Sequence, residues 1–115
     1  MRIRAAIPAD RDVVQSLFEE HLASLGYTPD AELDADMAGF PTSYTGTGNA
    51  FLLAVDANDQ PVGMGGIRQG EIRRIYVRPD SRGHGTARAL VLPLLQAAIA
   101  GGQADFRAIV ARHND

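Results

Sequence analysis

The stretch that decides the fold runs from residue 71 to residue 87 and reads EIRRIYVRPDSRGHGTA. Its first part predicts a strand over residues 71–78, and Pro79 ends the pairing because proline cannot donate a ladder hydrogen bond. Arg82-Gly83-His84-Gly85-Thr86-Ala87 then opens a segment with helical spacing. A helix N-terminus presents unpaired N–H groups, and neighbouring glycines let an anion approach the backbone closely. The stretch therefore predicts a strand–turn–helix that cradles a phosphate.

The spacing of the glycines separates this turn from two better-known phosphate sites. No Gly-Lys-Ser/Thr follows, as the nucleotide P-loop requires, and the glycine spacing does not fit the dinucleotide fingerprint. If the strand splays from its neighbour, the main-chain groups of Ile75 and Val77 can bind an amide-bearing ligand such as a pantetheine arm. The alternative is a turn that merely connects the strand to the helix. Such a turn requires neither an arginine at position 82 nor this spacing of glycines, so their presence favours the anion site.

The segment resembles the acyl-CoA-binding core of the GNAT superfamily of N-acyltransferases, whose signature is Gln/Arg-x-x-Gly-x-Gly/Ala. Arg82, Gly85 and Ala87 occupy the defining positions. The resemblance implies that acetyl-CoA is the co-substrate, with its pyrophosphate on the backbone amides of the turn and its pantetheine on the main chain of the preceding strand. The residues implied in binding are Ile75, Tyr76, Val77, Arg82, Gly83, His84, Gly85, Thr86 and Ala87.

Outward from this segment, the chain reads as one domain, residues 1–115, with an α/β fold and a mixed sheet. The expected order is β-α-α-β-β-β-α-β, which resembles the GNAT core without its final helix and two strands. Strands are expected over residues 2–7, 51–55, 61–68, 71–78 and 106–111. Helices are expected between Pro8 and Gly26 and over residues 30–40 and 85–100, with Leu33, Met37 and Phe40 on one side of the second helix. Gly63, Gly65 and Gly66 predict a bulge or a close backbone approach in the third strand, and Pro93 predicts a distortion of the last helix.

Composition restricts the partners of the chain. The net charge of −3 argues against a general nucleic-acid binder. There are no cysteines, and neither a signal peptide nor an apolar run of membrane-spanning length is visible, so we expect a cytoplasmic protein with no membrane partner. Three scattered histidines without clustered carboxylates do not form a ligand set, so we expect no metal.

The resemblance implies that an amine, on a small molecule or a protein, attacks the thioester directly and that a base and an acid move its protons. Glu71 is the candidate base, because some family members place a glutamate at the start of this strand. The alternative is a solvated strand-end glutamate paired with an arginine. Tyr76 is a candidate proton donor, or else a half-buried packing residue. His84 is expected to face solvent, and His21 to pack at the edge of the core.

Residues 26–49 wall the acceptor pocket in the family. Two interpretations of this segment stay open: an acidic wall suited to a cationic amine, or a solvated acidic helix face. The residues concerned are Tyr27, Asp30, Glu32, Asp34, Asp36 and Tyr44.

The chain ends where family members add a helix with a tyrosine acid and two further strands. Phe106, Ile109 and Val110 would then lie on a sheet edge, which we expect a second copy to cover in a homodimer. The first alternative to an active N-acetyltransferase is a non-catalytic CoA-binding module. The second is a truncated, inactive acyltransferase that dimerises.

Overall fold

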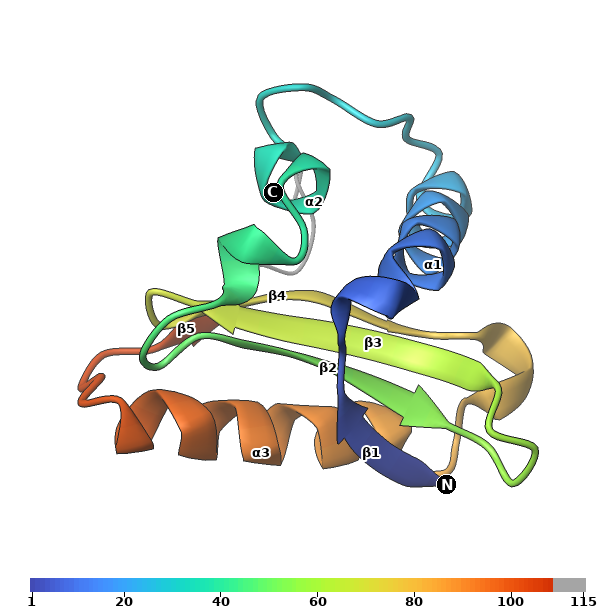
Figure 1. Cartoon of the computed structure of the whole chain (residues 1–115). Coiled ribbons are helices and arrows are strands. Elements are labelled where there is room, and N and C mark those ends of the chain that lie inside the picture. The colour runs from blue at the N-terminus through green and yellow to red at the C-terminus, as the bar shows by residue number, and fades with distance from the viewer. Residues whose placement is uncertain (109–115) are drawn as a thin grey trace.

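The computed structural model describes residues 1–108, which form a mixed sheet with helices on both faces (Figure 1). The strands lie in the order β1-β2-β3-β4-β5; the first four pair antiparallel, and β5 runs parallel to β4. Their bounds are β1 (Arg2–Ala5), β2 (Ala50–Val55), β3 (Pro61–Arg68), β4 (Glu71–Val77) and β5 (Arg107–Ala108). The predicted mixed α/β fold and its order of elements are confirmed.

Two helical layers cover the sheet. Helices α1 (Arg11–Ser24) and α2 (Ala35–Ala38) lie on one face, and α3 (Thr86–Ala100) lies on the other (Figure 1). The α1 side buries an apolar cluster that includes Phe18, Leu53 and Met64. The opposite side buries Leu90 and Leu94 of α3 against the sheet. The sheet is therefore apolar on both faces, as a central layer must be.

The first strand is shorter than predicted: β1 ends at Ala5 rather than at residue 7. Ile7 is 53% exposed, and its N–H donates to Asp10 Oδ2 at 2.8 Å. Arg4 also binds this carboxylate, with Nη1 2.8 Å from Oδ2. The carboxylate of Asp10 thus captures a backbone donor that a longer strand would need, and a short 3₁₀ turn over Pro8–Asp10 begins instead.

The predicted helix over residues 30–40 is wrong in extent, because only Ala35–Ala38 is α-helical. The carboxylate of Asp30 accepts the N–H groups of Glu32 and Leu33, each at 2.9 Å. This local turn competes with the i to i−4 bonds of a helix. Leu33 consequently faces outward, with 48% of its surface exposed, whereas Met37 and Phe40 are buried as expected.

The irregularity predicted in the glycine-rich third strand is present along both of its edges, and against β2 the register shifts at Val62, an extra residue of β3. The β3–β4 register shifts between Met64 and Gly66, and the extra residue belongs to β4, where Arg74 has φ of +63°. Opposite this bulge, a Cβ on Gly65 would stand 2.3 Å from Ile75 Cδ1. The missing side chain at Gly65 therefore makes room for Ile75, which is the close approach that the sequence predicts.

The last helix and strand lie where the sequence predicts them, except that the distortion expected at Pro93 does not interrupt the helix. Helix α3 runs through Pro93 without interruption, and Gly102 follows its end with φ of +89°. The predicted strand over residues 106–111 begins as β5, and Phe106 is 39% exposed beside it. Its remainder, with Ile109 and Val110, lies outside the described residues.

Candidate functional site

The turn between β4 and α3 has the backbone that the sequence predicts for an anion site. A short 3₁₀ turn over Pro79–Ser81 leaves the strand, and Gly83 and Gly85 then adopt φ of +83° and +74°. A Cβ built on either glycine meets no atom within 4 Å, so both face open space. Glycine is favoured here for its left-handed conformation, and any side chain would fill the space in front of the turn.

The N-terminus of α3 supplies hydrogen-bond donors at the same place. Gly85 is the N-cap, no side chain caps the helix, and the hydrogen bond from the Ala89 N–H to the Gly85 carbonyl is 3.0 Å long. The N–H groups of the first turn have no partner within a helix and carry a partial positive charge. The turn can therefore receive an anionic group such as a phosphate.

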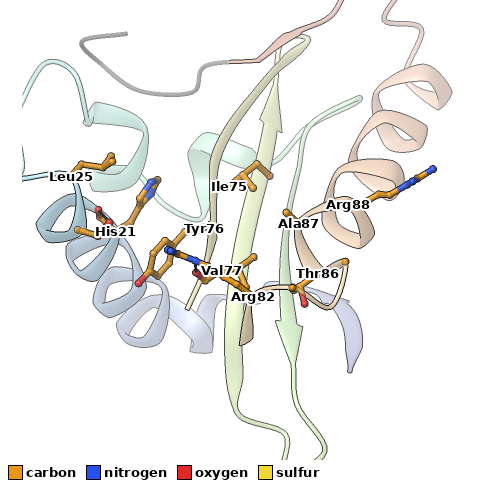
Figure 2. Close-up of a pocket in the computed structure, with 12 residues that line it drawn as sticks. His21, Leu25, Ile75, Tyr76, Val77, Arg82, Thr86, Ala87 and Arg88 are labelled. Carbon is orange, nitrogen blue, oxygen red and sulfur yellow. Dashed lines mark hydrogen bonds between the residues drawn. The ribbon is translucent and has the colours of Figure 1, made fainter. Parts of the chain in front are cut away.

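A pocket of about 380 Å³ lies between α1 and α3 along the end of β4 (Figure 2). It brings together eight of the nine residues that the resemblance implies in binding. The ninth, His84, is exposed and lines a smaller pocket on another side of the turn, in line with its expected orientation toward solvent. The pocket walls from the predicted set are Ile75, Tyr76, Val77, Arg82, Gly83, Gly85, Thr86 and Ala87.

The outer edge of β4 beside the pocket is open within residues 1–108. The pairing with β5 covers only Glu71 and Ile72, whereas Tyr76 and Val77 pair with β3 on the inner side alone. The continuation of β5 lies outside the described residues, so the splay expected at this end of β4 stays a prediction. One carbonyl at this end is already used, because Arg82 Nε donates to Val77 O at 2.9 Å.

Helix α1 and its C-cap contribute pocket residues that the sequence did not single out for binding: His21, Ser24 and Leu25. The His21 ring stacks on Tyr76, with ring centroids 4.9 Å apart and an interplanar angle of 17°. Its expected role as a packing residue is therefore compatible with a place in the pocket wall. Residues 21, 24 and 25 share one helix face, but only the tertiary structure brings that face to β4.

Tyr76 is a poor candidate for a proton donor in this geometry. Its hydroxyl donates to Glu20 Oε1 at 2.8 Å, and 4% of the residue is exposed. Burial and the contact with Glu20 raise the pKa of Tyr76 to about 12. A phenol with this pKa holds its proton more tightly than an ordinary thiol of about 8.5 does. The hydroxyl is engaged in structure, which is the packing alternative of the sequence analysis.

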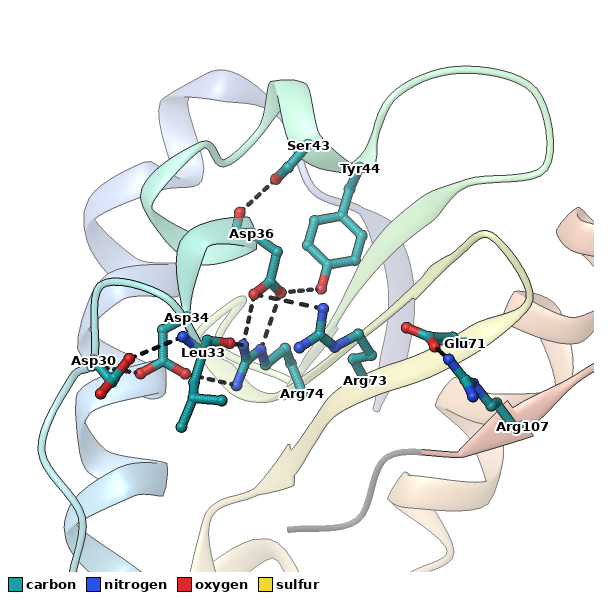
Figure 3. A network of polar contacts seen from close by, with 10 residues as sticks. All are labelled: Asp30, Leu33, Asp34, Asp36, Ser43, Tyr44, Glu71, Arg73, Arg74 and Arg107. Atoms are coloured by element: carbon teal, nitrogen blue, oxygen red, sulfur yellow. Dashed lines mark hydrogen bonds and ion pairs between the residues drawn. The ribbon is translucent and has the colours of Figure 1, made fainter. Parts of the chain in front are cut away.

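Glu71 lies at the opposite end of β4 from the phosphate turn. At about 3.3 Å per residue, it is about 13 Å along the strand from Ile75. Its carboxylate is ion-paired with Arg107 of β5 and 23% exposed (Figure 3). This is the pairing that the alternative interpretation describes, and a catalytic role for Glu71 stays a prediction.

The acidic residues between positions 26 and 49 do not form a free anionic wall (Figure 3). Arg74 binds Asp36 through Nε–Oδ2 at 3.0 Å and Nη2–Oδ1 at 2.6 Å, and binds Asp34 at 3.2 Å. The hydroxyl of Tyr44 also donates to Asp36, whose side chain is 1% exposed. Burial opposes the ionisation of Asp36, but the hydrogen bonds from Arg74 and Tyr44 outweigh it and lower its pKa. Asp34 and Asp36 thus fit neither interpretation of the sequence, because arginine neutralises both.

Two classes of feature are not found within residues 1–108. No group of three or more His, Cys, Asp or Glu side chains there is arranged to hold a metal ion. No helix in that part of the chain is both long and apolar enough to cross a membrane.

Comparison with known families identifies the class of protein. Residues 13–115 match the model of the acetyltransferase (GNAT) family. The chain therefore belongs to the GNAT acetyltransferase family, and the resemblance of its turn is confirmed. No curated protein sequence matches it significantly.

Solved structures give the same fold. A predicted acetyltransferase from Clostridium acetobutylicum, solved with acetyl-CoA, is 19% identical, with a TM-score of 0.79 over 96% of this chain and 81% of that one. A GNAT-family acetyltransferase from Staphylococcus aureus Mu50 is 13% identical, with a TM-score of 0.77 over 89% of this chain and 68% of that one. A GNAT phosphinothricin acetyltransferase from Sinorhizobium meliloti, in complex with acetyl-CoA, is 25% identical, with a TM-score of 0.66 over 86% of this chain and 60% of that one.

Proposed function

We propose that this chain binds acetyl-CoA in the pocket along β4 and transfers its acetyl group to an amine. The observation that carries the proposal is the convergence of the end of β4, the left-handed glycines Gly83 and Gly85, and the N-terminus of α3 on one pocket. The turn has room for the pyrophosphate, because no atom of the described residues lies within 4 Å of a Cβ built on either glycine. Two solved structures of similar fold were determined with acetyl-CoA, which supports the same ligand here.

In the proposed reaction, the nitrogen of a neutral amine attacks the thioester carbonyl carbon directly. A C–N bond forms, the C–S bond breaks, the amine loses a proton and the departing CoA thiolate gains one. The part of this chain is to hold the CoA and orient its thioester, since positioning accounts for much of the rate of such reactions. Glu71 is the residue that we propose as the proton acceptor, in which case its pair with Arg107 must open. The acceptor is a small-molecule amine or a protein amino group.

Calorimetry with acetyl-CoA, and with ADP as the control ligand, tests the binding step. In the variant Gly85→Glu, a side chain and a negative charge stand where the pyrophosphate is expected, so acetyl-CoA binding should disappear. Gly102→Glu is the matched control, because Gly102 has a similar φ of +89° and open space at the other end of α3. Equal binding by all three proteins, or none by a folded wild type, would contradict the proposed site.

A second candidate function is a CoA-binding module without turnover. It is favoured because the polar groups of both catalytic candidates are already engaged. Glu71 is ion-paired with Arg107, and the Tyr76 hydroxyl donates to Glu20. Thiol release from acetyl-CoA, measured over a panel of amines, separates the two functions. Thiol release that requires an amine and falls about a hundredfold in Glu71→Gln supports an N-acetyltransferase. Binding of acetyl-CoA without thiol release in the presence of any amine supports the non-catalytic module.

A further inference from the structure

Glu20 is an α1 residue that binds the end of β4 from outside the pocket. Its Oε1 accepts the hydroxyl of Tyr76 at 2.8 Å and Nε of Arg78 at 3.2 Å. The two donors hold the pKa of Glu20 below its ordinary value even though burial opposes ionisation. A single carboxylate oxygen thus ties α1 to two residues of the segment that leads into the phosphate turn.

The contacts continue from Tyr76 to the turn itself. The guanidinium carbon of Arg82 lies 5.8 Å from the centroid of the Tyr76 ring, within the range of a cation–π contact. Arg82 Nε donates to Val77 O at 2.9 Å, so the ring and the carbonyl together hold the arginine. Figure 2 shows Arg82 beside Tyr76 at the end of β4, whereas Arg88 extends away from the strand. Arg82 is therefore the arginine that these contacts keep at the pocket.

We propose that Glu20 is a positioning residue for the phosphate end of the CoA site, acting through Tyr76 on Arg82. The inference rests on the proposed function above. A free arginine loses much rotamer freedom when it binds a ligand, and fixing it beforehand reduces that loss. Glu20 holds the hydroxyl, the hydroxyl fixes the ring, and the ring supports the guanidinium where the pyrophosphate is expected. The acyl end of the ligand, farther along β4, gains nothing from this chain of contacts.

The test compares two thioesters that differ only at the phosphate end. Acetyl-CoA carries the pyrophosphate, and S-acetylpantetheine lacks it. We expect Glu20→Ala to weaken acetyl-CoA binding about tenfold, the effect of roughly one hydrogen bond to a charged group. Binding of S-acetylpantetheine should change less than about twofold, a margin that corresponds to no lost hydrogen bond. The matched control is Glu19→Ala, which removes an exposed glutamate one position earlier on α1.

Two further variants identify the path of the effect. Tyr76→Phe removes the hydroxyl but keeps the ring, so it should weaken acetyl-CoA binding as Glu20→Ala does, and the double variant should be no weaker than either single one. Glu20→Gln keeps an oxygen acceptor and should bind within about threefold of the wild type, because most of the hydrogen bond remains. If Glu20→Ala fails to fold, Tyr76→Phe and Glu20→Gln decide the question.

Failure of the inference differs from failure of the proposed function. A folded wild type that binds no acetyl-CoA removes both. A wild type that binds acetyl-CoA, with Glu20→Ala and Tyr76→Phe binding it equally well, overturns the inference alone. Equal weakening of acetyl-CoA and S-acetylpantetheine also overturns it, because a merely structural role would affect both ligands alike.

Discussion

The middle of β4 and the turn that follows the strand carry charge in opposite ways. Around Arg74, the central residue of the strand, the network with Asp34, Asp36 and Tyr44 is closed, with the Asp36 carboxylate almost entirely buried and bound by several donors. The turn around Gly83 and Gly85 is open, because the first N–H groups of α3 have no partner within the helix and no atom lies within 4 Å of a Cβ built on either glycine. A closed network contributes to the stability of the fold, whereas an open set of donors remains free for a ligand. The middle of the strand thus serves structure, and the turn after it serves binding.

The largest effect should follow from breaking the closed network around Arg74. Asp36→Ala leaves Arg74 buried without its main partner, and we expect a loss of about 3–5 kcal/mol in the free energy of unfolding. Urea unfolding followed by circular dichroism measures it, and Glu32→Ala, which removes an exposed carboxylate nearby, should cost below about 0.5 kcal/mol. If both variants cost the same, the network does not stabilise the fold, and the contrast between the middle of β4 and the turn after it fails.

The pH dependence of stability sharpens the comparison. The pKa of Asp36 is lower in the folded protein than its ordinary value of about 3.9. Its contribution is therefore fully present above about pH 4 and is lost as the pH falls through the folded-state value. We expect the difference in the free energy of unfolding between the wild type and Asp36→Asn to be smaller below pH 4 than at pH 7. Urea unfolding at pH 7 and at several pH values below 4 measures it. A gap that stays constant would mean that the charge on Asp36 contributes nothing.

The smallest effect on stability is expected at the open turn after β4. Gly83→Ala places a Cβ at φ of +83°, and Gly102→Ala does so at φ of +89°, both facing open space. Each should cost about 1 kcal/mol, since left-handed backbone is disfavoured for residues other than glycine. Only Gly83→Ala should weaken acetyl-CoA binding, because only there does the new methyl group stand before the phosphate turn. Equal binding by both variants in calorimetry would place the ligand elsewhere.

The sequence was sufficient where the decisive contacts are local. The phosphate turn is specified within residues 79–89 by proline, glycine and helical spacing, so its form could be predicted. The same holds for the order of the strands, since β2, β3 and β4 follow one another along the chain with short turns between them.

The sequence was insufficient where partners lie far apart. Tyr76 and Glu20 are separated by 56 positions, and Arg74 and Asp36 by 38. No periodicity relates such residues, so the acidic residues of the second helical segment appeared free. That helix was also predicted too long, because apolar spacing does not reveal that the carboxylate of Asp30 binds nearby N–H groups.

The walls of the pocket come from two segments far apart in the chain, residues 21–25 and 75–88, and their separation affects how the protein folds. Strands β2 to β4 can pair through short turns, but the pocket exists only after α1 has docked on β4 and α3 has docked on the opposite face. Pairings between distant segments form more slowly than local ones, so the pocket should be complete only late in folding. A ligand that recognises the pocket binds the native state but not the unfolded chain. At a hundred times its dissociation constant, such a ligand would add about 2.7 kcal/mol to the free energy of unfolding.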